Sequence, residues 1–136
     1  MIIMSVDLGK ARTGVAISDN SMQFAFPKAV ITEYNTERLI DKLCDKAREY
    51  EAQRIVVGLP KNMDGTSGER AQECSGIAQK IGEKSGIEIV LWDERCTTVT
   101  AHNYLSMNDV RGKNRKQEVD AVAATIILED YLRSLK

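Results

Sequence analysis

The pattern of hydrophobic and polar positions predicts three strands at the start of the chain. Apolar segments rich in β-branched residues occupy residues 2–8, 15–18 and 24–32, as is typical of strands. The turn at 9–14 contains glycines that let the backbone bend tightly. Pro27 cannot donate a ladder hydrogen bond, so it predicts an irregularity in the third strand.

The rest of the chain predicts helices that alternate with strands. A helix capped by Asn35 or Thr36 runs to about Glu51, because its apolar residues recur at helical spacing. The elements expected after it are a strand at 54–59, a loop at 60–68, a helix at 69–85 ended by Gly86, a strand at 87–92, a helix at 97–107, a polar loop at 108–115 and a helix at 116–135. This order predicts one α/β domain over residues 1–136, with a mixed β-sheet flanked by helices.

Composition and charge narrow the function classes. The net charge is −1, so the chain as a whole is not a polycation. Any contact with nucleic acid must therefore come from a local patch of basic residues. We expect no signal peptide, because the apolar start reaches Asp7 too soon and has no basic n-region. We expect no membrane association, because no apolar run approaches membrane-spanning length. Cys44, Cys74 and Cys96 are odd in number and lack C-x-x-C spacing, which argues against a disulfide framework or a zinc site. Cys44 and Cys74 are expected in the core, and the cytoplasm is the expected compartment.

Three acidic residues occupy positions where an acid is costly. Asp7 and Glu94 each end an apolar run, and Asp120 lies in a helix that is otherwise nearly all apolar. Converging carboxylates would repel one another unless cations neutralise them, and Mg²⁺ and Mn²⁺ prefer oxygen ligands. Together the three acids predict a metal site, with Asp7, Glu94 and Asp120 as catalytic residues for phosphoryl-transfer chemistry.

Simpler roles exist for each acid. Any one of them could cap a strand or pair with a nearby Arg or Lys, and Asp120 could pair with Lys116 one helical turn earlier. Lys116 could equally face a scissile phosphate. Strand alternation allows only one of Asp93 and Glu94 to point toward Asp7 unless the strand has ended, and alternation alone does not say which.

Basic residues near these acids predict contacts with nucleic acid. Arg111, Lys113, Arg115 and Lys116 crowd one short segment, and Lys10 and Arg12 lie close to Asp7 in sequence. Phosphate binding needs such local positive charge, although many charge runs are merely solvated. Arg95 could contact phosphate or pair with Asp93.

A loop before the second helix is a candidate phosphate site. Asn62, Thr66 and Ser67 could hydrogen-bond a phosphate beside the backbone N–H groups of the helix N-terminus. The alternative is an ordinary turn in which Ser67 caps the helix. A Cys96–His102 nucleophilic pair lacks an orienting motif, and Trp92 is expected in the core rather than as a base-stacking platform.

Four segments together resemble the YqgF family, also called RuvX-like, described as Holliday junction resolvases and pre-16S ribosomal RNA nucleases. The resemblance covers nearly the whole chain. Its motifs are Val6-Asp7-Leu8-Gly9 with Arg12-Thr13-Gly14, then Val57-Gly58-Leu59-Pro60 through Thr66, then Trp92-Asp93-Glu94-Arg95 through Thr98, and Lys116 followed by Asp120 and Ala123-Ala124. Cys96 departs from the family, which usually has a larger aliphatic residue there, and no loss of chemistry is expected from it.

The resemblance implies an RNase H-like fold with an acidic triad at Asp7, Glu94 and Asp120. It implies a nuclease that uses Mg²⁺ or Mn²⁺ to hydrolyse phosphodiester bonds in pre-ribosomal RNA or branched DNA. The alternative is a catalytically silent RNase H-like module that binds nucleic acid and assists ribosome maturation. The choice between RNA and DNA, the cleavage site and the oligomeric state cannot be read from the sequence.

Overall fold

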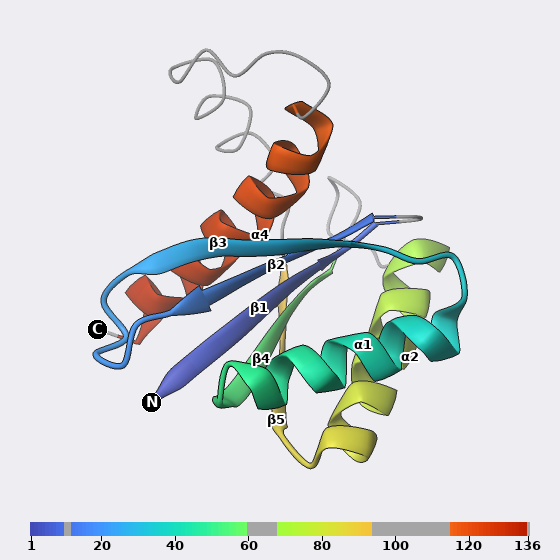
Figure 1. Cartoon of the computed structure of the whole chain (residues 1–136), viewed down its shortest axis with the longest axis horizontal. Coiled ribbons are helices and arrows are strands. Elements are labelled where there is room, and N and C mark those ends of the chain that lie inside the picture. The colour runs from blue at the N-terminus through green and yellow to red at the C-terminus, as the bar shows by residue number, and fades with distance from the viewer. Residues whose placement is uncertain (10–11, 60–67, 94–114, 136) are drawn as a thin grey trace.

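A five-stranded mixed sheet forms the centre of the molecule (Figure 1). The computed structural model describes residues 1–9, 12–59, 68–93 and 115–135, with side chains except at 93 and 115–121. The strands are β1 (Ile2–Leu8), β2 (Arg12–Ser18), β3 (Ala25–Thr32), β4 (Ala52–Leu59) and β5 (Glu88–Asp93), in the order β3-β2-β1-β4-β5. β1 pairs antiparallel with β2 and parallel with β4, and β4 pairs parallel with β5. The carboxyl ends of β1, β4 and β5 therefore meet at one edge of the sheet.

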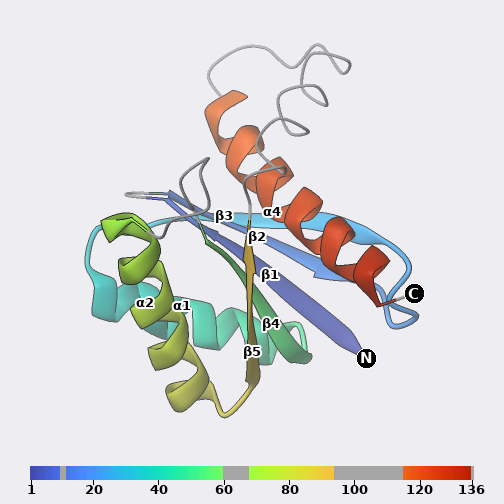
Figure 2. The ribbon, with the colours of Figure 1, turned by 180° about the vertical axis from the view of Figure 1, so that it is seen from behind.

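Helices cover both faces of this sheet. Helices α1 (Thr36–Glu49) and α2 (Glu69–Ser85) lie on one face, and α4 (Arg115–Ser134) crosses the other, as the view from behind shows (Figure 2). The α1/α2 core includes Met4, Val6, Val15, Ile55, Val57, Leu43, Cys74 and Ile81. The α4 core consists of Ile3, Ala16, Val56, Ala124, Ile127, Leu128, Tyr131 and Leu132. Among the described residues, no helix is long and apolar enough to span a membrane.

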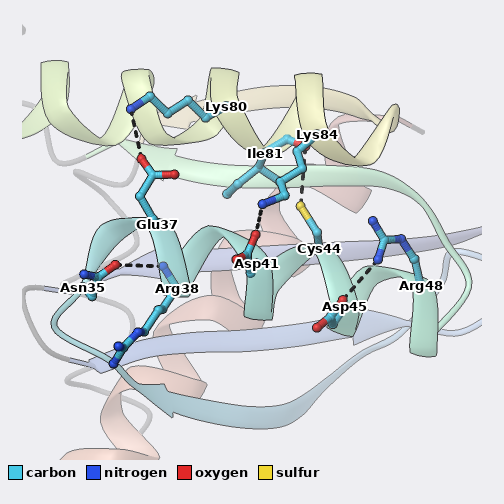
Figure 3. Close-up of polar contacts among 10 residues, drawn as sticks. All are labelled: Asn35, Glu37, Arg38, Asp41, Cys44, Asp45, Arg48, Lys80, Ile81 and Lys84. Carbon is cyan, nitrogen blue, oxygen red and sulfur yellow. Dashed lines mark hydrogen bonds and ion pairs between the residues drawn. The ribbon is translucent and has the colours of Figure 1, made fainter.

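Helix α1 makes polar contacts at its start and with α2 (Figure 3). The Asn35 side chain accepts a hydrogen bond of 3.0 Å from the Arg38 backbone N–H, so the expected N-cap is confirmed. Two exposed ion pairs, Glu37–Lys80 and Asp41–Lys84, link α1 to α2, and such pairs contribute little stability. Burial between these helices raises the pKa of the Cys44 thiol, which disfavours the reactive thiolate.

The predicted α/β architecture with a mixed sheet is confirmed, but some predicted boundaries are wrong. Helix α1 ends at Glu49 rather than at about Glu51, and β4 begins at Ala52 rather than at residue 54. The largest difference is at the start of β2. β2 begins at Arg12 rather than at residue 15. Thr13 and Gly14 pair with β1 on one side and β3 on the other, so two neighbouring strands override the local preference of a glycine for a turn. The irregularity expected around Pro27 is present, since the β2–β3 register shifts beside it on this edge strand. The helix predicted at 97–107 lies outside the described residues.

Candidate active site at the carboxyl edge of the sheet

Asp7 lies near the carboxyl end of β1, on the face that α4 covers. Side chains alternate along a strand. Met4, Val6 and Leu8 pack in the α1/α2 core, whereas Ile3 packs in the α4 core and the Ser5 hydroxyl contacts α4. Asp7 continues the second set and is only partly buried. The first predicted catalytic acid is therefore on a rigid central strand, close to the protein surface.

Glycines occupy both sheet positions beside Asp7. Its partner on β2 is Gly14. On β4, Gly58 stands one step beyond the Val6–Val57 pair, which is the last pair between β1 and β4. Because glycine has no side chain, neither neighbouring strand crowds the Asp7 carboxylate from these positions. Both glycines are visible in the sequence, but only the strand pairing shows that they flank the same acid.

A buried hydrogen bond connects β1 to α4. The Ser5 hydroxyl donates to the backbone carbonyl of Ala124 at 2.6 Å, although 119 residues separate the two in sequence. Ser5 is fully buried, so its hydroxyl needs this partner. The sequence analysis missed Ser5, and the signal that could have found it is a lone hydroxyl in the apolar run Ile2–Leu8.

α4 runs antiparallel to β1. Near its carboxyl end, the Tyr131 hydroxyl accepts a hydrogen bond of 2.8 Å from Arg54, which lies near the start of β4. The chain's amino terminus and the end of α4 accordingly lie at the same end of the molecule (Figures 1 and 2). The first turns of α4, which contain Asp120, therefore extend from Ala124 toward the carboxyl ends of the parallel strands.

β5 also presents one set of residues to α4. Val90 and Trp92 pack against the α4 core, and the Trp92 ring meets Tyr131 edge-on at a centroid distance of 5.6 Å. Ile89 packs against the opposite core. The strand ends at Asp93, level with Leu59 of β4. The expected packing role of Trp92 is confirmed, and Glu94 itself lies outside the described residues.

Arg12 is the one predicted nucleic-acid contact with a described side chain. It begins β2, pairs with Thr32 of β3 and is partly exposed. It shares the α4 face with Ala16, at the same edge of the sheet as Asp7. Arg115 and Lys116 lie in the first turn of α4, but their side chains are not described. Lys10, Arg95, Arg111 and Lys113 lie outside the described residues, as do Asn62, Thr66 and Ser67.

The start of α2 decides one alternative for the candidate phosphate loop. The N-cap residue of α2 is Gly68, which has no side chain that could form a capping hydrogen bond. The interpretation of Ser67 as the helix cap is therefore wrong, because the helix begins one residue too late for it. Whether the loop binds phosphate stays a prediction.

Gly9 makes the tight turn after β1 possible. A Cβ atom at this position would meet the backbone carbonyl oxygen of Arg12. We expect Gly9→Ala to lower the free energy of unfolding by roughly 1–3 kcal/mol, the usual cost of overpacking. Gly76→Ala is the matched control, because nothing lies within 4 Å of a Cβ atom there and alanine favours the helix interior. Urea unfolding should show the first variant weakened and the second unchanged or stabilised; equal midpoints would contradict this account of the turn.

The carboxylates predicted as metal ligands suit a hard divalent cation. Among the residues with described side chains, no three His, Cys, Asp or Glu residues gather closely enough to hold a metal. Of the predicted ligands, that part of the chain includes Asp7 alone. Its carboxylate, on a rigid strand between two glycine positions, is the kind of oxygen ligand that Mg²⁺ and Mn²⁺ take.

Comparison with known proteins identifies the family. A family model described as RuvX, Holliday junction resolvase, matches residues 1–134. The chain belongs to the RuvX family. A Bacillus cytotoxicus protein named "Putative pre-16S rRNA nuclease" is 42% identical over 137 residues, covering 98% of this chain and 99% of the relative. A Bacillus thuringiensis protein of the same name is 39% identical with the same coverage. The resemblance inferred from the four motifs is thus confirmed.

Solved structures agree on the fold of this RuvX-family chain. Thermus thermophilus RuvC in complex with a Holliday junction substrate has a TM-score of 0.62 at 12% identity, covering 98% of this chain and 96% of RuvC. The fowlpox virus resolvase bound to Holliday junction DNA has the same TM-score at 15% identity, covering 99% of both chains. At such low identity the likeness concerns the fold alone, and it confirms the predicted RNase H-like class.

Proposed function

We propose that this RuvX-family protein is a divalent-metal-dependent nuclease that hydrolyses phosphodiester bonds in structured nucleic acid. The observation that carries the proposal is the Ser5–Ala124 hydrogen bond, since it sets the register between the strand of Asp7 and the helix of Asp120. The names of the relatives favour precursor 16S ribosomal RNA as substrate, and the family description favours Holliday junctions. We place its action in the cytoplasm, where both nucleic acids occur in bacteria.

The spacing along the two elements supports a shared site for Asp7 and Asp120. Asp7 is two residues beyond Ser5, which is about 6.6 Å along a strand. Asp120 is four residues before Ala124, which is about 6 Å along a helix. Because α4 runs antiparallel to β1, both steps lead in the same direction, toward the carboxyl edge of the sheet. The two acids then occupy matching levels on facing elements.

Glu94 completes the proposed triad by strand alternation. The even positions Val90 and Trp92 of β5 share the α4 face with Asp7. Position 94 is the next even position after the strand ends at Asp93. This favours Glu94 over Asp93 as the third ligand, a choice that alternation in the sequence left open because both faces of β5 are apolar.

The three carboxylates together would hold Mg²⁺ or Mn²⁺. Bound there, the metal supplies Lewis acidity for attack of water on a phosphodiester. In this proposal, the chain would contribute three oxygen ligands held close together by β1, by α4 and by the end of β5. Asp7, on the central strand, is the ligand with the most strongly determined position.

Basic residues at the same edge would bind the nucleic-acid backbone. Arg12 lies on the face and edge of Asp7, and the basic segment formed by Arg111, Lys113, Arg115 and Lys116 leads into α4. Lys10, Arg95 and the loop residues Asn62, Thr66 and Ser67 are further candidate phosphate contacts in this proposal. Affinity that rests on such contacts falls steeply as salt rises.

A cleavage assay on two substrates tests the function. We expect the purified protein, with Mg²⁺ or Mn²⁺ but not with EDTA, to cut precursor 16S ribosomal RNA, a four-way DNA junction or both. Cleavage of one substrate identifies the natural class. Binding of both substrates without cleavage under any metal would overturn the proposal and leave a catalytically silent binding module.

A further inference from the structure

Arg70, in the first turn of α2, reaches the end of the strand that carries Asp7. Its Nη2 donates a hydrogen bond of 2.9 Å to the backbone carbonyl of Leu8, the residue directly after Asp7. Its Nη1 donates to the Glu73 carboxylate at 3.0 Å, which holds the guanidinium from the other side. The Arg70 side chain is 31% exposed, so most of it lies between α2 and β1 rather than in solvent.

The contact occurs where β4 stops pairing with β1, while β2 still pairs with β1 as far as Leu8–Thr13. The pairing between β1 and β4 ends at Val6–Val57, two residues before Leu8. Immediately after Leu8 comes Gly9, whose turn has no room for a side chain. A buried carbonyl needs a donor, and a charged donor forms a stronger hydrogen bond than a neutral one. Arg70 therefore fixes β1 at a point where ladder hydrogen bonds to β4 no longer do.

We propose that Arg70 is a positioning residue for the metal site. It holds the end of β1 so that the Asp7 carboxylate keeps the position and orientation that metal binding needs. This inference rests on the proposed metal-dependent nuclease. Some residues orient a metal ligand without binding the metal themselves, and their removal typically lowers metal affinity by 10- to 100-fold. Arg70 is thus expected to act through Asp7, without touching metal or substrate.

Arg54 offers a matched control at the opposite end of the sheet. It is also held by two contacts, to Glu88 at 2.9 Å and to the Tyr131 hydroxyl at 2.8 Å, and its side chain is 24% exposed. It lies near the start of β4, away from the carboxyl edge. Arg54→Met should lower stability, as should Arg70→Met, but only Arg70→Met should affect the end of β1.

Calorimetric titration with Mn²⁺, without nucleic acid, tests the proposal. We expect Arg70→Met to weaken Mn²⁺ binding by about 10- to 100-fold, and Arg70→Lys to recover most of it, because lysine keeps the charge and one donor. Glu73→Gln, which leaves the Leu8 contact in place, and Arg54→Met should bind Mn²⁺ like the wild type. Wild-type Mn²⁺ affinity in folded Arg70→Met would overturn the proposal.

A direct phosphate contact is the competing role for Arg70, and salt dependence separates the two. A lost phosphate contact would reduce the log–log salt slope of nucleic-acid binding by about 0.7 to 0.9. Positioning predicts an unchanged slope, so a reduced slope with normal Mn²⁺ affinity also overturns the inference.

Amide hydrogen exchange in the metal-free protein keeps this test separate from the proposed function. If the wild type binds no Mn²⁺, the proposed function fails, and exchange alone decides whether Arg70 holds the strand end. We expect faster exchange at Leu8 and Thr13 in Arg70→Met than in Arg54→Met. Equal rates would refute the role of Arg70.

Discussion

Asp7→Asn is expected to abolish cleavage while the fold survives. Asparagine keeps the shape of the side chain but removes the charge that a divalent cation needs. Loss of one electrostatic contact to a transition state typically costs roughly 10²- to 10³-fold in rate, and loss of a central metal ligand should cost at least as much. Without metal, the free energy of unfolding should stay unchanged or rise slightly, because one source of repulsion among the acids is gone.

Asp19→Asn is the control for this experiment. Asp19 lies in the turn between β2 and β3, at the edge opposite the proposed site, where a hydrogen bond from the Ser21 hydroxyl and others from backbone N–H groups lower its pKa to about 2. Its replacement should weaken the turn and leave cleavage intact. Should Asp7→Asn cut at the wild-type rate, Asp7 is not a metal ligand and the proposed mechanism is wrong.

Glu94→Gln and Asp93→Asn should have different effects although the two residues are adjacent. We expect Glu94→Gln to remove cleavage and weaken Mn²⁺ binding. In the proposed site, position 94 would continue the alternation of Val90 and Trp92, the β5 residues that pack against the α4 core. We expect Asp93→Asn to cost mainly stability, since position 93 belongs to the alternate set, with Ile89 and Leu91. Parallel measurements of cleavage rate, Mn²⁺ affinity and urea unfolding distinguish the two.

The reverse pattern would move the catalytic assignment. An inactive Asp93→Asn beside an active Glu94→Gln would mean that the alternation breaks where β5 ends. Glutamine and asparagine are matched in kind, since each replaces one carboxylate oxygen by an amide nitrogen. A difference between the two variants would therefore report position rather than the type of substitution.

The fold could be predicted from the sequence because its local signals agree with its final packing. Apolar runs gave the central strands, and Asn35 marked the start of α1. The start of β2 was predicted too late, because Gly14 suggests a turn by itself and becomes part of a strand only through its two neighbours. Pairing between distant segments overrides local propensity here.

The residues of the candidate site stay a prediction from the sequence, and the sequence alone does not predict how they are arranged. The sequence shows that Asp7, Glu94 and Asp120 occupy positions where a buried charge would be costly. No local pattern shows which face of the sheet each of them lies on. The Ser5–Ala124 hydrogen bond, which joins residues far apart in the chain, places α4 against the face of the sheet that carries Asp7. Glu94 lies outside the described residues. The role inferred for Arg70 was missed because its contact is with the backbone of Leu8 and leaves no side-chain motif.

The most direct measurement of the central claim is Mn²⁺ binding to the wild type and to an Asp7→Asn/Glu94→Gln/Asp120→Asn triple variant. The account predicts saturable binding by the wild type, with a stabilisation of about 2.7 kcal/mol when free Mn²⁺ is 100 times its Kd. The triple variant should show neither binding heat nor a rise in Tm. An identical response of the two proteins to Mn²⁺ would contradict the claim that these three carboxylates form one metal site.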